Sequence, residues 1–119
     1  MSFMWQQLLE QIQTGDFKAL ARSISLVENE HHGYEVLLLQ LPANHHTKII
    51  GVTGPPGAGK STLVDGLIGE LAKNGNKVAV LCVDPSSPFN MGAVLGDRIR
   101  MHQWYTHPNV FIRSLPSQI

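Results

Sequence analysis

Residues 54–61 read Gly-Pro-Pro-Gly-Ala-Gly-Lys-Ser, and the rest of the chain can be interpreted outward from this stretch. It fits the pattern of a glycine, four residues and then Gly-Lys-Ser/Thr that is typical of phosphate-binding loops. Glycines allow consecutive backbone N–H groups to turn toward one centre, and a helix that follows adds the positive end of its dipole. We therefore expect Lys60 to reach the β- and γ-phosphates of a nucleotide and Ser61 to ligate the Mg²⁺ that bridges them.

The segments on either side of this loop have the character that the motif requires. Residues 48–53, Lys-Ile-Ile-Gly-Val-Thr, form a short apolar run typical of a β-strand. Apolar residues at helical spacing follow the loop, which predicts a helix to about residue 74: Leu63, Val64, Leu67, Ile68, Leu71 and Ala72. A chance match in a loop is the alternative, and both flanks argue against it. The residues expected to bind phosphate are Gly54, Pro55, Pro56, Gly57, Ala58, Gly59, Lys60, Ser61 and Thr62.

Two further strands are predicted after this helix. Residues 78–83 are six consecutive apolar residues, which predicts a strand buried on both faces. Together with residues 48–53 and the helix, this strand would complete a right-handed βαβ unit with a parallel strand pair. Residues 110–113 are expected to form a third strand after a turn at Pro108-Asn109. The predicted fold is α/β: a P-loop NTPase three-layer sandwich with a parallel sheet, here truncated.

Residues 1–46 are interpreted as a helical N-terminal extension and residues 47–119 as the N-terminal part of the P-loop domain. Three helices are expected in the extension: one that ends at Thr14-Gly15, one that Asp16 caps and that runs to Glu30, and one over residues 34–41. Gly33 is expected to take a positive φ. Apolar periodicity of this kind indicates packing surfaces more often than ligand contacts.

The composition argues against nucleic-acid binding, secretion and membrane insertion. Nine basic and nine acidic residues balance, and no basic stripe is present, so we expect no nucleic-acid interface. The N-terminus lacks the features of a signal peptide, and the longest apolar run, residues 78–83, is too short to cross a bilayer. The single cysteine, Cys82, lies in that run and cannot form an internal disulfide. We therefore expect a cytoplasmic protein with no membrane partner.

Two aspartates are candidates for metal and water chemistry. Asp84 follows the strand at residues 78–83, at the sheet edge where open α/β sheets bind ligands, and could hold Mg²⁺. It could equally cap the Pro-Ser-Ser-Pro turn that follows. Asp97 is a weaker candidate, because with Arg98 and Arg100 beside it a surface ion pair would explain it.

The other chemically versatile side chains suggest no site. Histidine spacing matches no zinc site, so histidines are not expected to bind metal. Trp104 and Tyr105 are interpreted as packing residues, because no basic groove accompanies them.

Four segments carry a resemblance to a known family. They are residues 83–88 (Val-Asp-Pro-Ser-Ser-Pro), residues 95–101 (Leu-Gly-Asp-Arg-Ile-Arg-Met), residues 20–29 and residues 50–62. The chain resembles the MeaB/ArgK-type P-loop GTPases, the bacterial relatives of the human methylmalonic aciduria type A protein. The resemblance runs over nearly the whole chain. The phosphate loop is widespread, whereas the first two segments are specific.

The resemblance implies a Mg²⁺-dependent GTPase that acts as a chaperone for a cobalamin-dependent methylmalonyl-CoA mutase-type enzyme. It implies GTP and GDP as ligands, a homodimer in full length, and Asp84 and Asp97 as residues around the Mg²⁺. Lys60, Asp84 and Asp97 would then be catalytic, and Ser61, Asp84 and Asp97 would be metal ligands. Older names in the family describe a transport ATPase or kinase.

The sequence also departs from the family pattern. Asn90-Met91-Gly92 stands where the family has a glycine-rich pair. The Glu-Thr-Val-Gly segment, the guanine-reading Asn-Lys-x-Asp segment and the C-terminal dimerisation arm are absent, so we expect an N-terminal fragment that is itself inactive. Two alternatives stay open: a P-loop kinase that transfers phosphate to an acceptor, and a nucleotide-binding fragment without turnover.

Overall fold

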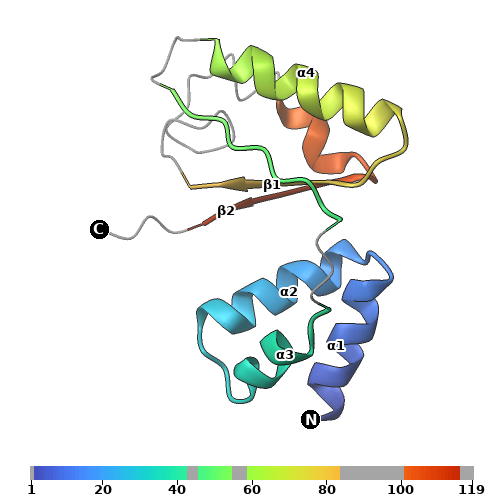
Figure 1. The fold of residues 1–119 in the computed structure, drawn as a ribbon, viewed down its shortest axis with the longest axis vertical. Coiled ribbons are helices and arrows are strands. Elements are labelled where there is room, and N and C mark those ends of the chain that lie inside the picture. Colours follow the sequence, from blue (N-terminus) through green and yellow to red (C-terminus); the bar gives the residue numbers. More distant parts are fainter. Residues whose placement is uncertain (1, 43–45, 55–58, 84–100, 116–119) are drawn as a thin grey trace. The chain divides into compact units, whose positions relative to one another are not determined.

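The computed structural model describes residues 2–42, 46–54, 59–83 and 101–115. These residues form two compact units, residues 1–49 and residues 50–119, and each is considered separately (Figure 1). No helix in the described ranges is both long and apolar enough to cross a bilayer.

The first unit consists of three helices, as predicted: α1 (Phe3–Gln13), α2 (Phe17–Glu28) and α3 (Tyr34–Gln40). The predicted cap at Asp16 is confirmed, because its Oδ1 accepts hydrogen bonds from the backbone N–H groups of Lys18 at 2.9 Å and Ala19 at 3.3 Å. The second helix was expected to reach Glu30, but α2 ends two residues earlier and Glu30 has a φ of +50°. Local capping therefore determines where these helices begin and end.

The core of this unit is a cluster of Trp5, Leu8, Ala19 and Leu37, one or two residues from each helix. The indole Nε1 of Trp5 donates to the carbonyl of His32 at 2.9 Å, and Gly33 takes the expected positive φ of +92°. A Cβ at Gly33 would lie 2.6 Å from that indole nitrogen, so glycine is required for close approach as well as for conformation. The helices thus pack against each other, as their periodicity predicted.

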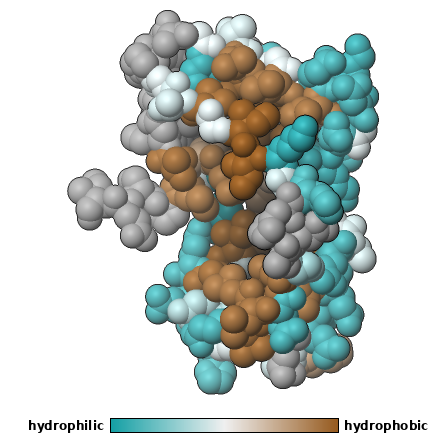
Figure 2. Space-filling model, in the orientation of Figure 1, coloured by the Kyte–Doolittle hydropathy of each residue, from teal (hydrophilic) through white to brown (hydrophobic). Residues whose placement is uncertain are grey.

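Apolar side chains also remain exposed in this unit. Of the apolar residues in α3, Leu37 is buried, whereas Val36, Leu38 and Leu39 are exposed. Figure 2 shows apolar surface within both units. A helix of seven residues has too little face in contact with α1 and α2 to bury more.

The second unit contains α4 (Lys60–Lys73), β1 (Val78–Cys82), a 3₁₀ helix η1 (His102–Thr106) and β2 (Val110–Ser114). The strands β1 and β2 are parallel, and Val78 pairs with Val110 through to Cys82 with Ser114. The helix α4 ends close to residue 74, as predicted, and Gly75 follows its C-cap residue with a φ of +82°. The predicted turn at Pro108-Asn109 leads directly into β2.

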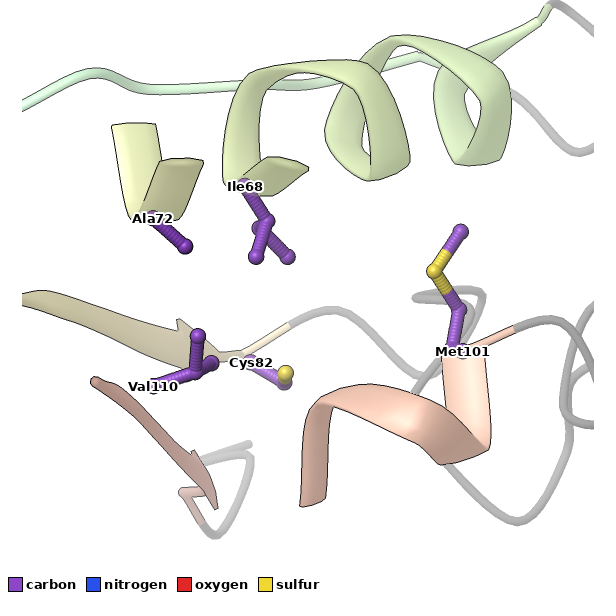
Figure 3. Close-up of a cluster of buried hydrophobic side chains, with 5 residues drawn as sticks. All are labelled: Ile68, Ala72, Cys82, Met101 and Val110. Carbon is purple, nitrogen blue, oxygen red and sulfur yellow. The ribbon is translucent and has the colours of Figure 1, made fainter. Parts of the chain in front are cut away.

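Alternate residues of the two strands face α4 and build the core. Figure 3 shows Ile68 and Ala72 projecting from α4 toward Cys82 and Val110 of the sheet, with Met101 pointing into the same space. Met101 is fully buried, and Trp104 packs against this cluster. The interpretation of Trp104 as a packing residue is therefore confirmed.

Three predictions about the sheet are wrong. The described residues between 46 and 54 form no strand, and Ile49 is 93% exposed. The parallel partner of β1 is β2 and not residues 48–53. A β-type composition suits a pleated sheet, but a strand forms only where a neighbour supplies hydrogen-bond partners. The strand β1 is also buried on one face only, since Leu81 is 54% exposed.

Candidate phosphate-binding site

The candidate site begins where α4 begins. Gly59 is the N-cap residue with a φ of +84°, and its carbonyl accepts the first helical hydrogen bond, from the N–H of Leu63 at 3.1 Å. Lys60, Ser61 and Thr62 then form the first turn of α4. The N–H groups of a first turn have no partner within the helix, so they are directed out of its end. The predicted phosphate-loop motif is thus placed at a helix N-terminus, the position that favours anions.

The charge of the first turn is suited to an anion. Lys60 supplies a positive side chain, and the first turn of α4 carries no acidic residue. The N-cap residue has no side chain that could accept a hydrogen bond from the first-turn N–H groups. A bound phosphate would therefore meet no competing carboxylate in this turn of the helix.

The side chain of Lys60 reaches back across the loop. Its Nζ donates to the carbonyl of Gly54 at 3.1 Å. This hydrogen bond connects the first residue of α4 with the first residue of the glycine-rich stretch. Gly54 has a φ of +151°, a conformation that side-chain-bearing residues rarely adopt. The ammonium group therefore lies next to the residue at which the glycine-rich stretch begins, although it belongs to the first residue of α4.

Ser61 and Thr62 place two hydroxyl groups in the same turn as Lys60. A serine hydroxyl is a hard oxygen ligand of the kind that Mg²⁺ accepts alongside phosphate oxygens and water. Ser61 is partly buried and Thr62 is exposed. The chemistry of this turn therefore fits a Mg²⁺–polyphosphate ligand, and the role of Ser61 as a ligand of the metal stays a prediction.

Several predicted site residues lie outside the described residues. They are Pro55, Pro56, Gly57, Ala58, Asp84 and Asp97. The role of the two aspartates in metal binding stays a prediction. In the described ranges, no group of three or more His, Cys, Asp or Glu side chains is placed to hold a metal ion.

One polar contact near the site was not predicted. The indole Nε1 of Trp104 donates to Oδ1 of Asp65 at 2.9 Å, which links η1 to the second turn of α4. The two residues are 39 positions apart, and no motif or spacing connects them. Only the packing of η1 on α4 brings them together.

Gly59 and Gly66 provide a matched test of the local geometry. Among the described residues, no atom lies within 4 Å of a Cβ added at either glycine, but of the two only Gly59 has a positive φ. Gly59→Ala is expected to destabilise the protein by about 1–2 kcal/mol, because an L-residue is strained in this conformation. Gly66→Ala is expected to stabilise it by about 0.5–1 kcal/mol through helix propensity. Chemical denaturation measures both, and a gain in stability from Gly59→Ala would contradict the assigned N-cap conformation.

Comparison with known proteins connects this chain with one family. A family model described as "Methylmalonyl Co-A mutase-associated GTPase MeaB" matches residues 20–118. A protein of Pyrococcus horikoshii whose name describes it as a GTPase is 49% identical over 113 residues, 94% of this chain and 36% of the relative. The GTPase ArgK of Escherichia coli is 40% identical over 114 residues, 92% of this chain and 34% of the relative.

A eukaryotic relative is also similar. The mitochondrial methylmalonic aciduria type A homolog of Caenorhabditis elegans is 36% identical over 128 aligned positions, 94% of this chain and 32% of the relative. The chain thus spans about a third of the length of these relatives.

Proposed function

The chain belongs to the family of methylmalonyl-CoA mutase-associated GTPases of the MeaB type, and from this premise we propose that the protein binds Mg²⁺–GTP and hydrolyses it. The observation that carries the proposal is the position of Lys60 at the N-terminus of α4, with its ammonium group 3.1 Å from the Gly54 carbonyl. The matching relatives are named as GTPases, which supports a nucleotide as the anion.

In the proposed mechanism, backbone N–H groups of Gly54 and of residues 57–62 bind the phosphate oxygens, since Pro55 and Pro56 have no N–H to donate. Lys60 balances the charge that develops on the γ-phosphoryl group, and Ser61 ligates the metal. When bound, Mg²⁺ would supply charge neutralisation to the phosphates, with Ser61 as the residue of this turn that would hold it. A water molecule attacks the γ-phosphorus in line, the bond from phosphorus to the β,γ-bridging oxygen breaks, and GDP and phosphate are released. Asp84 and Asp97 are proposed to hold the metal and its water.

The proposal assigns roles to both parts of the chain. Residues 47–119 would be the N-terminal part of a three-layer P-loop NTPase domain, and residues 1–46 a helical extension. The exposed side chain of Leu81 on β1 supports a sheet whose second face is covered in the whole protein, because the parallel sheets of such folds are covered on both faces.

The biological role rests on the family description and on the name of the Caenorhabditis elegans relative. We propose that the whole protein assists a cobalamin-dependent methylmalonyl-CoA mutase-type enzyme, acts as a homodimer and works in the cytoplasm. A segment that is ordered differently with bound GTP and with bound GDP would carry the signal to that partner. The 119-residue chain alone is proposed to bind nucleotide without efficient turnover.

Calorimetric titration of the full-length protein with GTP, GDP and ATP in the presence of Mg²⁺ tests the proposal. We expect GTP and GDP to bind more tightly than ATP, and γ-labelled GTP to release its label only as free phosphate. Label that appears on an acceptor molecule would identify a kinase instead. Absence of nucleotide binding in the full-length protein would overturn the proposed function.

The same titration with the 119-residue chain locates the determinant of base choice. Equal affinity of this chain for ATP and GTP would place guanine recognition in the part of the protein beyond these residues. Binding without phosphate release would support the proposed inactivity of the chain alone.

A further inference from the structure

We propose that Trp104 is a positioning residue for the phosphate site and that it acts through Asp65. This inference rests on the proposed nucleotide binding at the N-terminus of α4. It concerns how that end of the helix is held in place, and it starts from an uneven distribution of packing along α4.

The buried residues of α4 lie in its C-terminal half. Ile68 and Ala72 are buried against the sheet, whereas residues 60–67 contain no fully buried side chain. Val64 is partly buried and Leu63 is 53% exposed. Gly66 and Gly69 further reduce the helix's intrinsic stability. The half that carries Lys60 and Ser61 is therefore held less firmly by apolar packing than the half that forms the core.

Trp104 makes one contact with this less buried half of α4 and a second contact just beyond it. Its Nε1 donates to Oδ1 of Asp65 at 2.9 Å, and its ring lies 3.6 Å from the position that a Cβ on Gly69 would occupy. A hydrogen bond to a charged acceptor is stronger than one between neutral groups. Asp65 is five positions after Lys60 on the same helix, so a restraint on Asp65 limits movement of the first turn.

Trp104 is itself fixed from the side of the sheet. Its ring centroid lies 5.7 Å from that of His107, whose Nδ1 accepts a hydrogen bond from the N–H of Asn109 at 3.1 Å. The N–H of Val110, the first residue of β2, donates to the carbonyl of His107 at 3.2 Å. A continuous set of contacts thus runs from β2 through His107 and Trp104 to Asp65. These contacts would fix the distance between the first turn of α4 and the sheet.

The two tryptophans of the chain provide a matched control. Trp5, in the first unit, also donates its indole N–H to an oxygen at 2.9 Å, the carbonyl of His32. Trp5→Phe and Trp104→Phe each keep an aromatic ring and remove one indole donor. Only the second variant removes a bond to α4.

The experiment measures the affinity of the full-length protein for Mg²⁺–GDP. We expect Trp104→Phe and Asp65→Ala each to weaken binding roughly three- to tenfold, the effect of one charge-assisted hydrogen bond partly transmitted to the site. The double variant should bind Mg²⁺–GDP about as tightly as either single variant, because both substitutions remove the same interaction. Asp65→Asn should weaken binding less than Asp65→Ala does, since its amide oxygen still accepts the indole N–H but without the negative charge. Trp5→Phe should leave the affinity unchanged.

Hydrogen exchange separates positioning from general destabilisation. In Trp104→Phe, the amides of residues 64–67 should exchange faster, while those of residues 68–73 keep their protection. Unchanged affinity in both Trp104→Phe and Asp65→Ala, or uniform loss of protection along α4, would overturn the inference. If the wild type binds no GDP, the proposed function fails first. If the wild type binds GDP and Lys60→Ala does not, while the Trp104 and Asp65 variants bind normally, only the positioning role fails.

Discussion

Lys60→Ala in the full-length protein is expected to weaken Mg²⁺–GTP binding by about a hundredfold or more and to remove measurable hydrolysis. A charged donor that contacts phosphate oxygens contributes more than a neutral hydrogen bond, and its contribution grows as charge develops in the transition state. The change also removes the hydrogen bond from Nζ to the Gly54 carbonyl, so the two ends of the glycine-rich segment lose their direct connection. Calorimetric titration and a phosphate-release assay measure the two effects.

Lys73→Ala is the matched control for this prediction. Lys73 is the last residue of α4, so the same substitution is made on the same helix at the opposite end. Loss of a cation near a helix C-terminus costs about 0.3–1 kcal/mol of stability and should leave the nucleotide affinity unchanged. If Lys60→Ala bound GTP as tightly as Lys73→Ala, the assignment of the phosphate site to the start of α4 would be wrong.

Ile68→Ala is expected to produce the largest loss of stability, about 2–4 kcal/mol, because it creates a cavity between α4 and the sheet. Ile68 belongs to the buried cluster that contains Cys82, Met101 and Val110 (Figure 3). Urea denaturation followed by tryptophan fluorescence in a Trp5→Phe background reports on this unit, since Trp104 is then the single tryptophan. The expected result is a lower midpoint with an unchanged slope.

Leu63→Ala on the same helix tests whether the effect depends on burial. Leu63 is exposed in the described structure, so its removal should change the free energy of unfolding by no more than about 0.5 kcal/mol. Equal losses from Leu63→Ala and Ile68→Ala would contradict the orientation of α4 on the sheet.

The start of a helix directly after the glycine-rich segment was predictable from local sequence. A glycine-rich segment followed by Lys-Ser predicts a helix N-terminus with a positive charge, and the structure places Lys60 as the first residue of α4. The metal-binding roles of Asp84 and Asp97 stay predictions, because both residues lie outside the described ranges. The hydrogen bond between Trp104 and Asp65 had no signal in the sequence, since a single contact between distant residues leaves no pattern.

In the part of the chain that the structure describes, the sequence by itself determined α1 to α4 and where each of them begins, whereas α2 ends two residues before its predicted end. Their hydrogen bonds join residues four apart, and Asp16, Gly59 and Gly75 act on neighbouring backbone groups, so the information is local. Only the tertiary structure decided that β1 pairs with β2, that β1 is buried on one face, and that Trp104 meets α4. The partner of a strand lies far away in the chain, and the choice depends on the total surface that each arrangement buries. The pairing of a strand therefore cannot be worked out from the residues next to it in the sequence.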